Sequence, residues 1–177
     1  MFVNIETKRM LLKCVDQSDG EFIFEEFQND FINKYLYDEE PMTDIEQAND
    51  LIKFFTMDEP RNQNRWVLIN KLENKKMGTC GFHRWDRKKD KAELGFELMQ
   101  QYTGKGYMTE AVEAIIEFAQ IKMKVNKIIA VVYIENSMCK RLLENLGFII
   151  VDKEDCIFKG SVYSHDVYKL ELLKMDF

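Results

Sequence analysis

The spacing of apolar residues changes period several times along the chain and predicts strands interleaved with helices. Strands are predicted at residues 5–15, 66–70, 77–85, 92–99 and 127–133, with two more before residue 173. The clearest helix follows residue 107 and carries one apolar face: Met108, Ala111, Val112, Ile115, Phe118, Ala119 and Met123. A later helix, over residues 136–146, is expected to end at Gly147. This order predicts an α+β fold (an α/β sandwich), with a mixed, mostly antiparallel sheet flanked by helices.

Two short patterns predict where the first helices begin. Ser18 with Glu21, and Thr43 with Glu46, have the spacing of a capping box, and apolar residues follow each pair at helical intervals. Between these helices, residues 31–42 form an aromatic and acidic connection.

The length and the N-terminal sequence favour one cytoplasmic domain. A chain of 177 residues is long enough for a single core, so residues 1–177 are expected to form a single domain. The chain has no apolar run long enough to span a membrane. Glu6, Lys8 and Arg9 interrupt the N-terminal apolar residues, which argues against a signal peptide.

The net charge and the histidine and cysteine content restrict which ligands and metals the chain is expected to bind. The net charge of −6 disfavours binding to nucleic acid and would attract a cationic substrate. Two histidines far apart in the sequence do not indicate a zinc site, so no metal is expected. The four cysteines are scattered, which favours free thiols: Cys14, Cys80, Cys139 and Cys156.

The most informative segment is Gln101-Tyr102-Thr103-Gly104-Lys105-Gly106, between a predicted strand and the clearest helix. Two glycines let backbone N–H groups turn towards one point, and the helix N-terminus adds unpaired donors, so the junction suits a pyrophosphate. A tight strand-to-helix turn needs such glycines even without a ligand. The spacing matches neither a P-loop nor a dinucleotide-binding fingerprint.

The pattern Gln-x-x-Gly-x-Gly resembles the acetyl-CoA-binding motif of the GNAT family of N-acetyltransferases. Further segments resemble the same family in the same order: residues 91–98 its fourth strand, 127–133 its fifth, and 136–148 the following helix that closes with Leu-Gly-Phe. The start, residues 5–12, resembles the branch that contains the ribosomal-protein N-terminal acetyltransferases. The resemblance implies the GNAT fold, acetyl-CoA as co-substrate and direct attack by an amine, without a covalent enzyme intermediate.

The resemblance also implies which residues contact the cofactor. Backbone groups from Thr103 through Gly104, Lys105, Gly106 and Tyr107 to Met108 would surround the pyrophosphate. Leu98 and Met99 would present their backbone to the pantetheine arm, and Gln101 is the polar start of the motif. Asn136 would bind the cofactor, a role compatible with that of a helix N-cap. Lys140 would contact a phosphate, although a solvated lysine is the simpler interpretation.

Catalysis requires a proton acceptor for the amine and gains from a donor for the leaving thiolate. Glu93 is the first candidate base, since its strand position matches a catalytic glutamate of some GNAT branches; a salt bridge to Lys91, Lys76 or Arg84 is the alternative. Glu97 and His83 are weaker candidates.

The family's usual acid is a tyrosine seven positions after the asparagine, and here that position is Leu143. Cys139 would be a weak donor at best.

The acceptor is expected to be the α-amine at the N-terminus of a protein or peptide. An α-amine titrates near ~8 and an alkylamine near ~10.4, so an enzyme without an evident acid suits the α-amine better. Asp38, Glu39 and Glu40 would attract a basic tail, or form a solvated acidic loop. A polyamine or other small amine, and a protein that binds acetyl-CoA without turnover, are the alternatives. A homodimer is left open.

Overall fold

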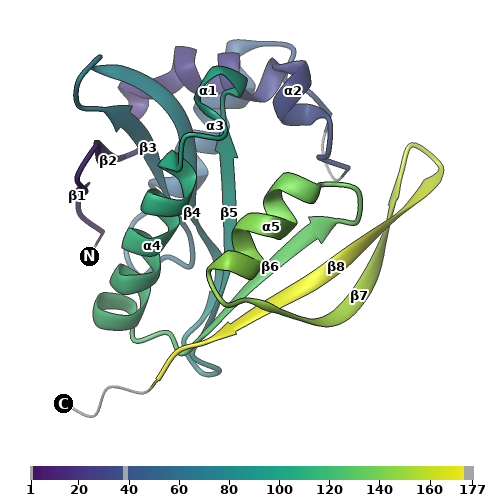
Figure 1. Ribbon diagram of the computed structural model, residues 1–177. Coiled ribbons are helices and arrows are strands. Elements are labelled where there is room, and N and C mark those ends of the chain that lie inside the picture. Colours follow the sequence, from purple (N-terminus) through teal and green to yellow (C-terminus); the bar gives the residue numbers. More distant parts are fainter. Residues whose placement is uncertain (1, 38–39, 174–177) are drawn as a thin grey trace.

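The computed structural model describes residues 2–37 and 40–173, in which eight strands form one mixed sheet (Figure 1). The strand order across the sheet is β1-β2-β3-β4-β5-β6-β8-β7. The strands are β1 Ile5–Glu6, β2 Met10–Cys14, β3 Asn64–Asn70, β4 Lys75–Asp86, β5 Lys91–Leu98, β6 Lys127–Tyr133, β7 Ile149–Phe158 and β8 Ser161–Glu171. The helices are α1 Gly20–Gln28, α2 Asp30–Asn33, α3 Ile45–Phe55, α4 Tyr107–Phe118 and α5 Ser137–Asn145. The predicted fold class is therefore confirmed.

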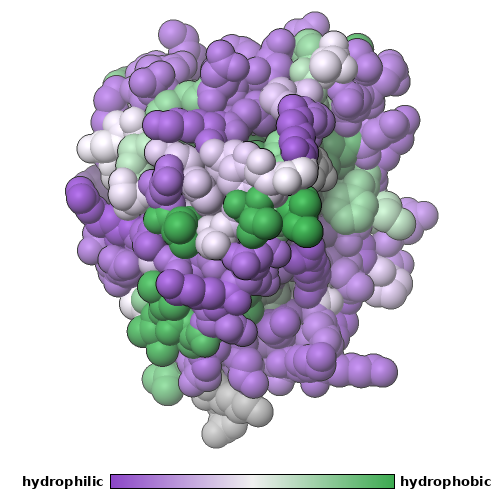
Figure 2. Space-filling view, turned by 90° about the vertical axis from the view of Figure 1, so that its right-hand side faces the viewer, coloured by the Kyte–Doolittle hydropathy of each residue, from purple (hydrophilic) through white to green (hydrophobic). Residues whose placement is uncertain are grey.

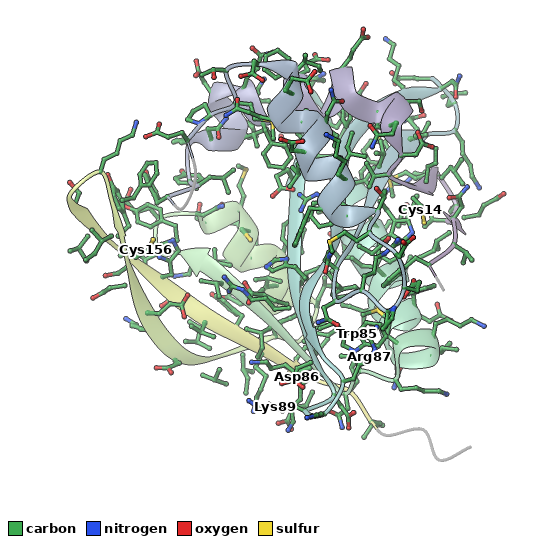
Figure 3. The ribbon with its side chains drawn as sticks, turned by 180° about the vertical axis from the view of Figure 1, so that it is seen from behind. Cys14, Trp85, Asp86, Arg87, Lys89 and Cys156 are labelled. Carbon is green, nitrogen blue, oxygen red and sulfur yellow. The ribbon has the colours of Figure 1, made fainter. Side chains whose placement is uncertain are left out.

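Helices cover both faces of the sheet. Helices α4 and α5 lie in front of it in Figure 1, and α1 and α3 lie on the opposite face, towards the viewer in Figure 3. The core between these layers is built on large, fully buried side chains such as Trp66, Phe82 and Ile115. None of the helices described is long and apolar enough to cross a membrane.

The sheet divides between β5 and β6. Strands β2 to β5 are an antiparallel meander, in agreement with the predicted mostly antiparallel sheet, whereas β6 runs parallel to β5. The parallel pairing extends from Lys91 opposite Lys127 to Glu93 opposite Ile129. Beyond these residues the two strands diverge, as Figure 1 shows, so the C-terminal half of β5 pairs with β4 on one side and has none of the described strands as a neighbour on the other.

The predicted capping boxes are wrong by one or two residues. Asp16 and Asp44 are the N-caps: Asp16 accepts a hydrogen bond from the Ser18 backbone, and Asp44 from the Glu46 backbone. Their reciprocal partners are Asp19 and Gln47. Aspartate caps a helix as well as serine or threonine does, so the flanking aspartates compete with the residues chosen from the sequence.

Other element boundaries differ less. The strand predicted at residues 5–15 is divided into β1 and β2, which pair as a hairpin. The short helix α2 was not predicted; the side chain of Asn29 accepts hydrogen bonds from the backbone of Phe31 and Ile32 and fixes its start. Strand β6 and the left-handed Gly147 that follows α5 agree with the prediction.

The hairpin of β7 and β8 projects from one edge of the sheet (Figure 1). Figure 2 faces this side of the molecule and shows a mostly hydrophilic surface with separate hydrophobic patches. The hairpin carries exposed apolar side chains: Ile149, Ile150, Val151, Ile157 and Val162.

Candidate active site

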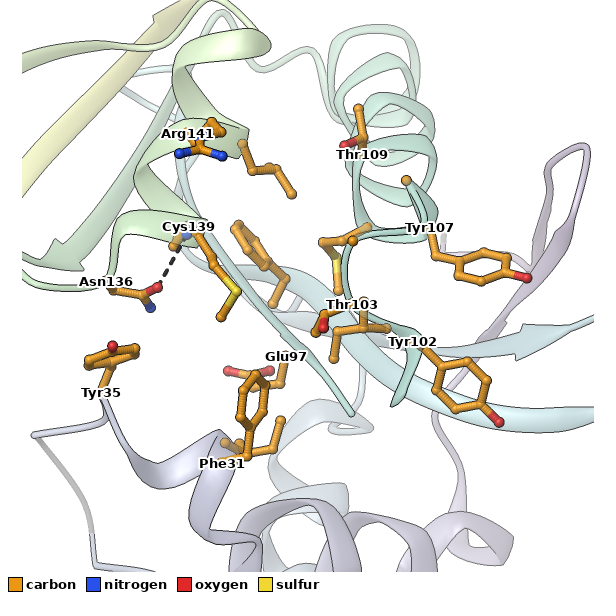
Figure 4. Close-up of a pocket in the computed structure, with 18 of the residues that line it drawn as sticks. Phe31, Tyr35, Glu97, Tyr102, Thr103, Tyr107, Thr109, Asn136, Cys139 and Arg141 are labelled. Atoms are coloured by element: carbon orange, nitrogen blue, oxygen red, sulfur yellow. Dashed lines mark hydrogen bonds between the residues drawn. The ribbon is translucent and has the colours of Figure 1, made fainter. Parts of the chain in front are cut away.

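A cavity of about 600 Å³ opens where β5 and β6 diverge (Figure 4). Its walls come from the end of β5, the turn before α4 with the first residues of that helix, one side of α5 along its whole length, and α2 with the residues that follow it. Phe31 and Tyr35 lie at one end of the cavity, and Thr109 and Arg141 lie at the other. The lining is largely apolar, so polar groups that face the cavity are poorly hydrated and interact strongly with a ligand.

The turn before α4 is shaped for an anion. Gly104 and Gly106 both have left-handed backbones, with φ of +70° and +74°. Gly106 is the N-cap of α4, and among the described residues no side chain caps this end of the helix. The first N–H groups of a helix have no intrahelical partner, and the helix dipole is positive there, so this turn suits a phosphate group.

Arg9 holds this turn from the N-terminal part of the chain. Its Nη1 donates to the Lys105 carbonyl oxygen at 2.8 Å, and its Nε donates to Glu110 Oε2 at 2.6 Å. Its guanidinium lies 4.4 Å from the centre of the Tyr107 ring. Arg9 and Glu110 were not among the predicted site residues, and no local pattern near residue 9 indicates this contact.

Glu97 and Glu93 have different surroundings although they lie on the same strand. Glu97 lines the cavity, and Figure 4 shows its carboxylate beside Phe31. Glu93 is not among the residues that line it; its carboxylate accepts hydrogen bonds from His83 at 2.9 Å and from Arg84 at 3.0 Å. Burial alone would raise the pKa of Glu93, but these partners outweigh burial, and its pKa lies below the ordinary value. The predicted alternative for Glu93, a salt bridge to Arg84, is therefore present.

Known proteins resemble this chain over nearly its whole length. A family model described as an acetyltransferase (GNAT) domain matches residues 9–149. The uncharacterized N-acetyltransferase p20 of Bacillus licheniformis is 31% identical over 176 residues, which cover 97% of this chain and 96% of p20. The chain belongs to the GNAT family of acetyltransferases. It is an N-acetyltransferase, and acetyl-CoA is its co-substrate.

Solved structures of GNAT acetyltransferases share the fold. The spermidine N-acetyltransferase of Vibrio cholerae, in complex with CoA and spermine, has a TM-score of 0.83 at 18% identity, covering 93% of this chain and 96% of its own. The ribosomal-protein-S5-alanine acetyltransferase of Vibrio fischeri has a TM-score of 0.77 at 20% identity, covering 96% and 97%. At these identities the likeness shows the fold alone.

The predicted cofactor residues fall into two groups, according to whether they line the cavity. One group lines the cavity: Leu98, Thr103, Gly104, Gly106, Tyr107, Met108 and Asn136. The other group does not: Met99, Gln101, Lys105 and Lys140. The backbone N–H of Met99 already donates to the Met77 carbonyl oxygen. The carbonyl oxygen of Lys105 accepts the hydrogen bond from Arg9.

Two neighbouring cations on α5 differ in the same way. Lys140 Nζ lies 2.6 Å from Asp166 Oδ2, an ion pair that is mostly buried. Arg141 lines the cavity instead, and Figure 4 shows its guanidinium directed into it. Arg141, and not the predicted Lys140, therefore lines the cavity, because the helical phase that decides which side chain faces the cavity is not fixed by the sequence alone. Asn136, whose Oδ1 accepts from the Cys139 backbone, is the N-cap of α5, as expected.

The position of the family's usual acid is filled by Leu143, which is fully buried. Cys139 lines the cavity, but burial raises the pKa of its thiol to about 12, so it is a poor proton donor at neutral pH. Across the described residues, no group of three or more His, Cys, Asp or Glu side chains is placed to hold a metal ion.

Proposed function

We propose that this acetyltransferase acts on the α-amine at the N-terminus of a protein or peptide. The observation that carries the proposal is the charge of the cavity lining: among the described residues, Glu97 is the one carboxylate that lines it. A single carboxylate suits a single ammonium group, whereas a polyamine carries several positive charges that each need a partner once they leave water.

Acetyl-CoA supplies the acetyl group as a thioester. The uncapped N-terminus of α4 and the left-handed turn at Gly104 and Gly106 are proposed to bind the phosphates, with Arg141 as their counter-charge. This binding is proposed to hold the thioester inside the cavity, so that attack by the amine becomes effectively intramolecular.

Glu97 is proposed as the proton acceptor for the amine, because its carboxylate faces the cavity. Deprotonation of an α-amine at neutral pH costs about 1 kcal/mol, whereas an alkylamine costs roughly 4–5 kcal/mol. A site in which Leu143 replaces the usual acid fits the smaller cost. Glu93 stays a predicted base, but its lowered pKa makes it a poorer proton acceptor at neutral pH.

The acceptor is proposed to enter past α2, where Phe31 and Tyr35 form the wall. Glu40, one of the acidic residues expected to attract a basic tail, lies 2.6 Å from Lys159 Nζ and is partly neutralised. Asp38 and Glu39 lie outside the described residues. Recognition of the acceptor is therefore proposed to rest on shape and apolar contact, with Glu97 binding the amine.

A polyamine is the second candidate acceptor, and one structural feature favours it. Tyr35 lies beside an aromatic cluster. The Tyr37 and Tyr163 rings of this cluster stack with their centres 3.8 Å apart, and the centre of the Tyr133 ring lies 6.0 Å from that of Tyr35. Aromatic faces attract ammonium groups, so this cluster would bind the distal amine of a polycation.

Acetylation of three acceptors separates the candidates: a short peptide with a free N-terminus, the same peptide with its N-terminus blocked, and spermidine. The proposal predicts that thiol release from acetyl-CoA is fastest with the free peptide and that blocking abolishes it. Faster turnover of spermidine would support the polyamine instead. Equal turnover of both peptides through a lysine side chain would also contradict the proposal. Binding of acetyl-CoA without turnover of any amine would indicate a chain that has lost catalysis.

A further inference from the structure

Glu97 belongs to a polar cluster whose other members are buried behind it, on the side of the sheet that α1 covers. Glu26 of α1, Arg65 of β3 and Thr79 of β4 meet there, and Thr79 is paired with Glu97 in the sheet register. Glu26 and Thr79 are completely buried, and Arg65 is 6% exposed. Thus one member of the cluster, Glu97, faces the cavity, and the other three are enclosed in the core.

The hydrogen bonds converge on the Thr79 hydroxyl. Arg65 Nε donates to Thr79 Oγ1 at 2.9 Å, Thr79 Oγ1 donates to Glu26 Oε2 at 2.8 Å, and Glu97 Oε2 lies 3.2 Å from the same hydroxyl. Arg65 also forms an ion pair with Glu97. A hydroxyl has one hydrogen to donate and can accept two hydrogen bonds, so Thr79 can donate to only one of the two carboxylates at a time.

The charges of the cluster favour one extra proton. Glu26 and Glu97, when both are ionised, carry two negative charges against the single positive charge of Arg65. Glu26 Oε1 is buried and, within the described part of the chain, has no hydrogen-bond partner, which makes the ionised form costly. Burial raises the pKa of Glu26 to about 7 against the opposing effects of Arg65 and Thr79. Neighbouring Cys80 stays a neutral thiol, because burial raises its pKa to about 12.

We propose that Glu97 passes the proton of the attacking amine through the Thr79 hydroxyl to Glu26, which stores it until the product leaves. The inference rests on Glu97 as the base of the proposed function. When Glu97 is protonated, its O–H donates to Thr79 Oγ1 while the Thr79 O–H donates to Glu26 Oε2. A concerted shift of both hydrogens leaves Glu26 protonated, Thr79 neutral and Glu97 ionised again.

The protons balance over one turnover. The ammonium group begins with three N–H bonds and ends as an amide with one. As the N–C bond forms and the C–S bond breaks, the departing sulfur takes one proton and Glu97 takes the other. After product release, the stored proton returns by the same route, from Glu26 through Thr79 to Glu97 and then to water in the cavity. The Arg65 bond to Thr79 is kept throughout, since it uses the second acceptor position of the hydroxyl.

The first test needs no acceptor. Infrared spectra of the whole protein, recorded as a function of pH, report the C=O stretch of a buried protonated carboxylic acid. The inference predicts a band that disappears with a midpoint near pH 7. Glu26→Gln should remove the band, and Glu25→Gln, an exposed neighbour on α1, should keep it. A wild-type protein without such a band, or a band that survives in Glu26→Gln, would overturn the storage role.

The second test measures the transfer itself. Thr79→Val keeps the shape of the side chain and removes the hydroxyl, and Thr79→Ser restores the hydroxyl. Because Glu26 must be ionised to accept the proton, the inference predicts that wild-type kcat rises through neutral pH. For the better of two acceptors, the free peptide or spermidine, kcat of Thr79→Val should fall by on the order of 10²-fold and lose this rise, while Thr79→Ser stays close to wild type. Circular dichroism and thermal unfolding verify that both variants are folded.

The outcomes separate the inference from the proposed function. A folded Thr79→Val variant with the wild-type kcat and pH profile would overturn the relay. If Glu97→Gln were inactive while Thr79→Val kept the wild-type kcat, the base assignment would stand without the relay. A preference for spermidine would change only the proposed acceptor, because the relay test uses whichever amine reacts faster.

Discussion

Gly104 and Gly160 offer a matched pair for testing the phosphate turn. Both have left-handed backbones, with φ of +70° and +77°, and in both a Cβ would meet no other atom within 4 Å. An alanine at such a position costs roughly 1–2 kcal/mol in backbone strain. Gly104→Ala and Gly160→Ala should therefore lower the free energy of unfolding by similar amounts. Of these two glycines, Gly104 lines the cavity and Gly160 does not.

The two variants should differ in the affinity for CoA. In Gly104→Ala the new methyl group occupies space in which the proposed site places a phosphate. Loss of one charge-assisted hydrogen bond is worth about 1.5–3 kcal/mol, which corresponds to roughly 10- to 150-fold weaker binding. Isothermal titration calorimetry with CoA measures the affinity, and denaturant unfolding measures the strain. Wild-type affinity in Gly104→Ala would refute the phosphate site, and an equal loss of affinity in Gly160→Ala would show that the effect is only global strain.

The remaining predictions compare neighbouring residues. Glu97→Gln should lower kcat/KM by on the order of 10²-fold, and Glu93→Gln should lower it far less. Thiol-release assays across pH test this, and a larger loss in Glu93→Gln would identify Glu93 as the base. Arg141→Gln should raise the Kd for CoA by about tenfold or more, while Lys140→Gln, which breaks the ion pair with Asp166, should lower the melting temperature and leave the affinity close to wild type. Calorimetry and thermal unfolding of both variants test this, and unchanged affinity in Arg141→Gln would contradict the assigned counter-charge.

Local sequence features were enough to predict most of the fold. The spacing of apolar residues in the strands, the apolar face of α4 and the glycine turn each depend on residues close together in the chain. The parallel pairing of β5 with β6 was not predicted, because strand direction and register are set by packing across the sheet.

The site was predicted less completely for the same reason. The glycines were found because a turn requires them locally. Glu26, Arg65 and Thr79 have no such signal: they lie far apart in the sequence and meet only through the sheet register and the packing of α1. Arg141 was missed because its side chain faces the cavity only in the helical phase that α5 adopts.

The Arg9 contact joins the first hairpin to the turn that is proposed to bind the phosphates of CoA. Arg9 lies between β1 and β2, yet it bonds to the Lys105 carbonyl oxygen and to Glu110. If the hairpin orders the turn that receives CoA, then by thermodynamic reciprocity CoA must order the hairpin by the same free energy. Hydrogen exchange of the β1 and β2 amides should therefore slow when CoA is added. An opening of this hairpin would then weaken binding of the cofactor at the proposed turn, although no residue that lines the turn has changed.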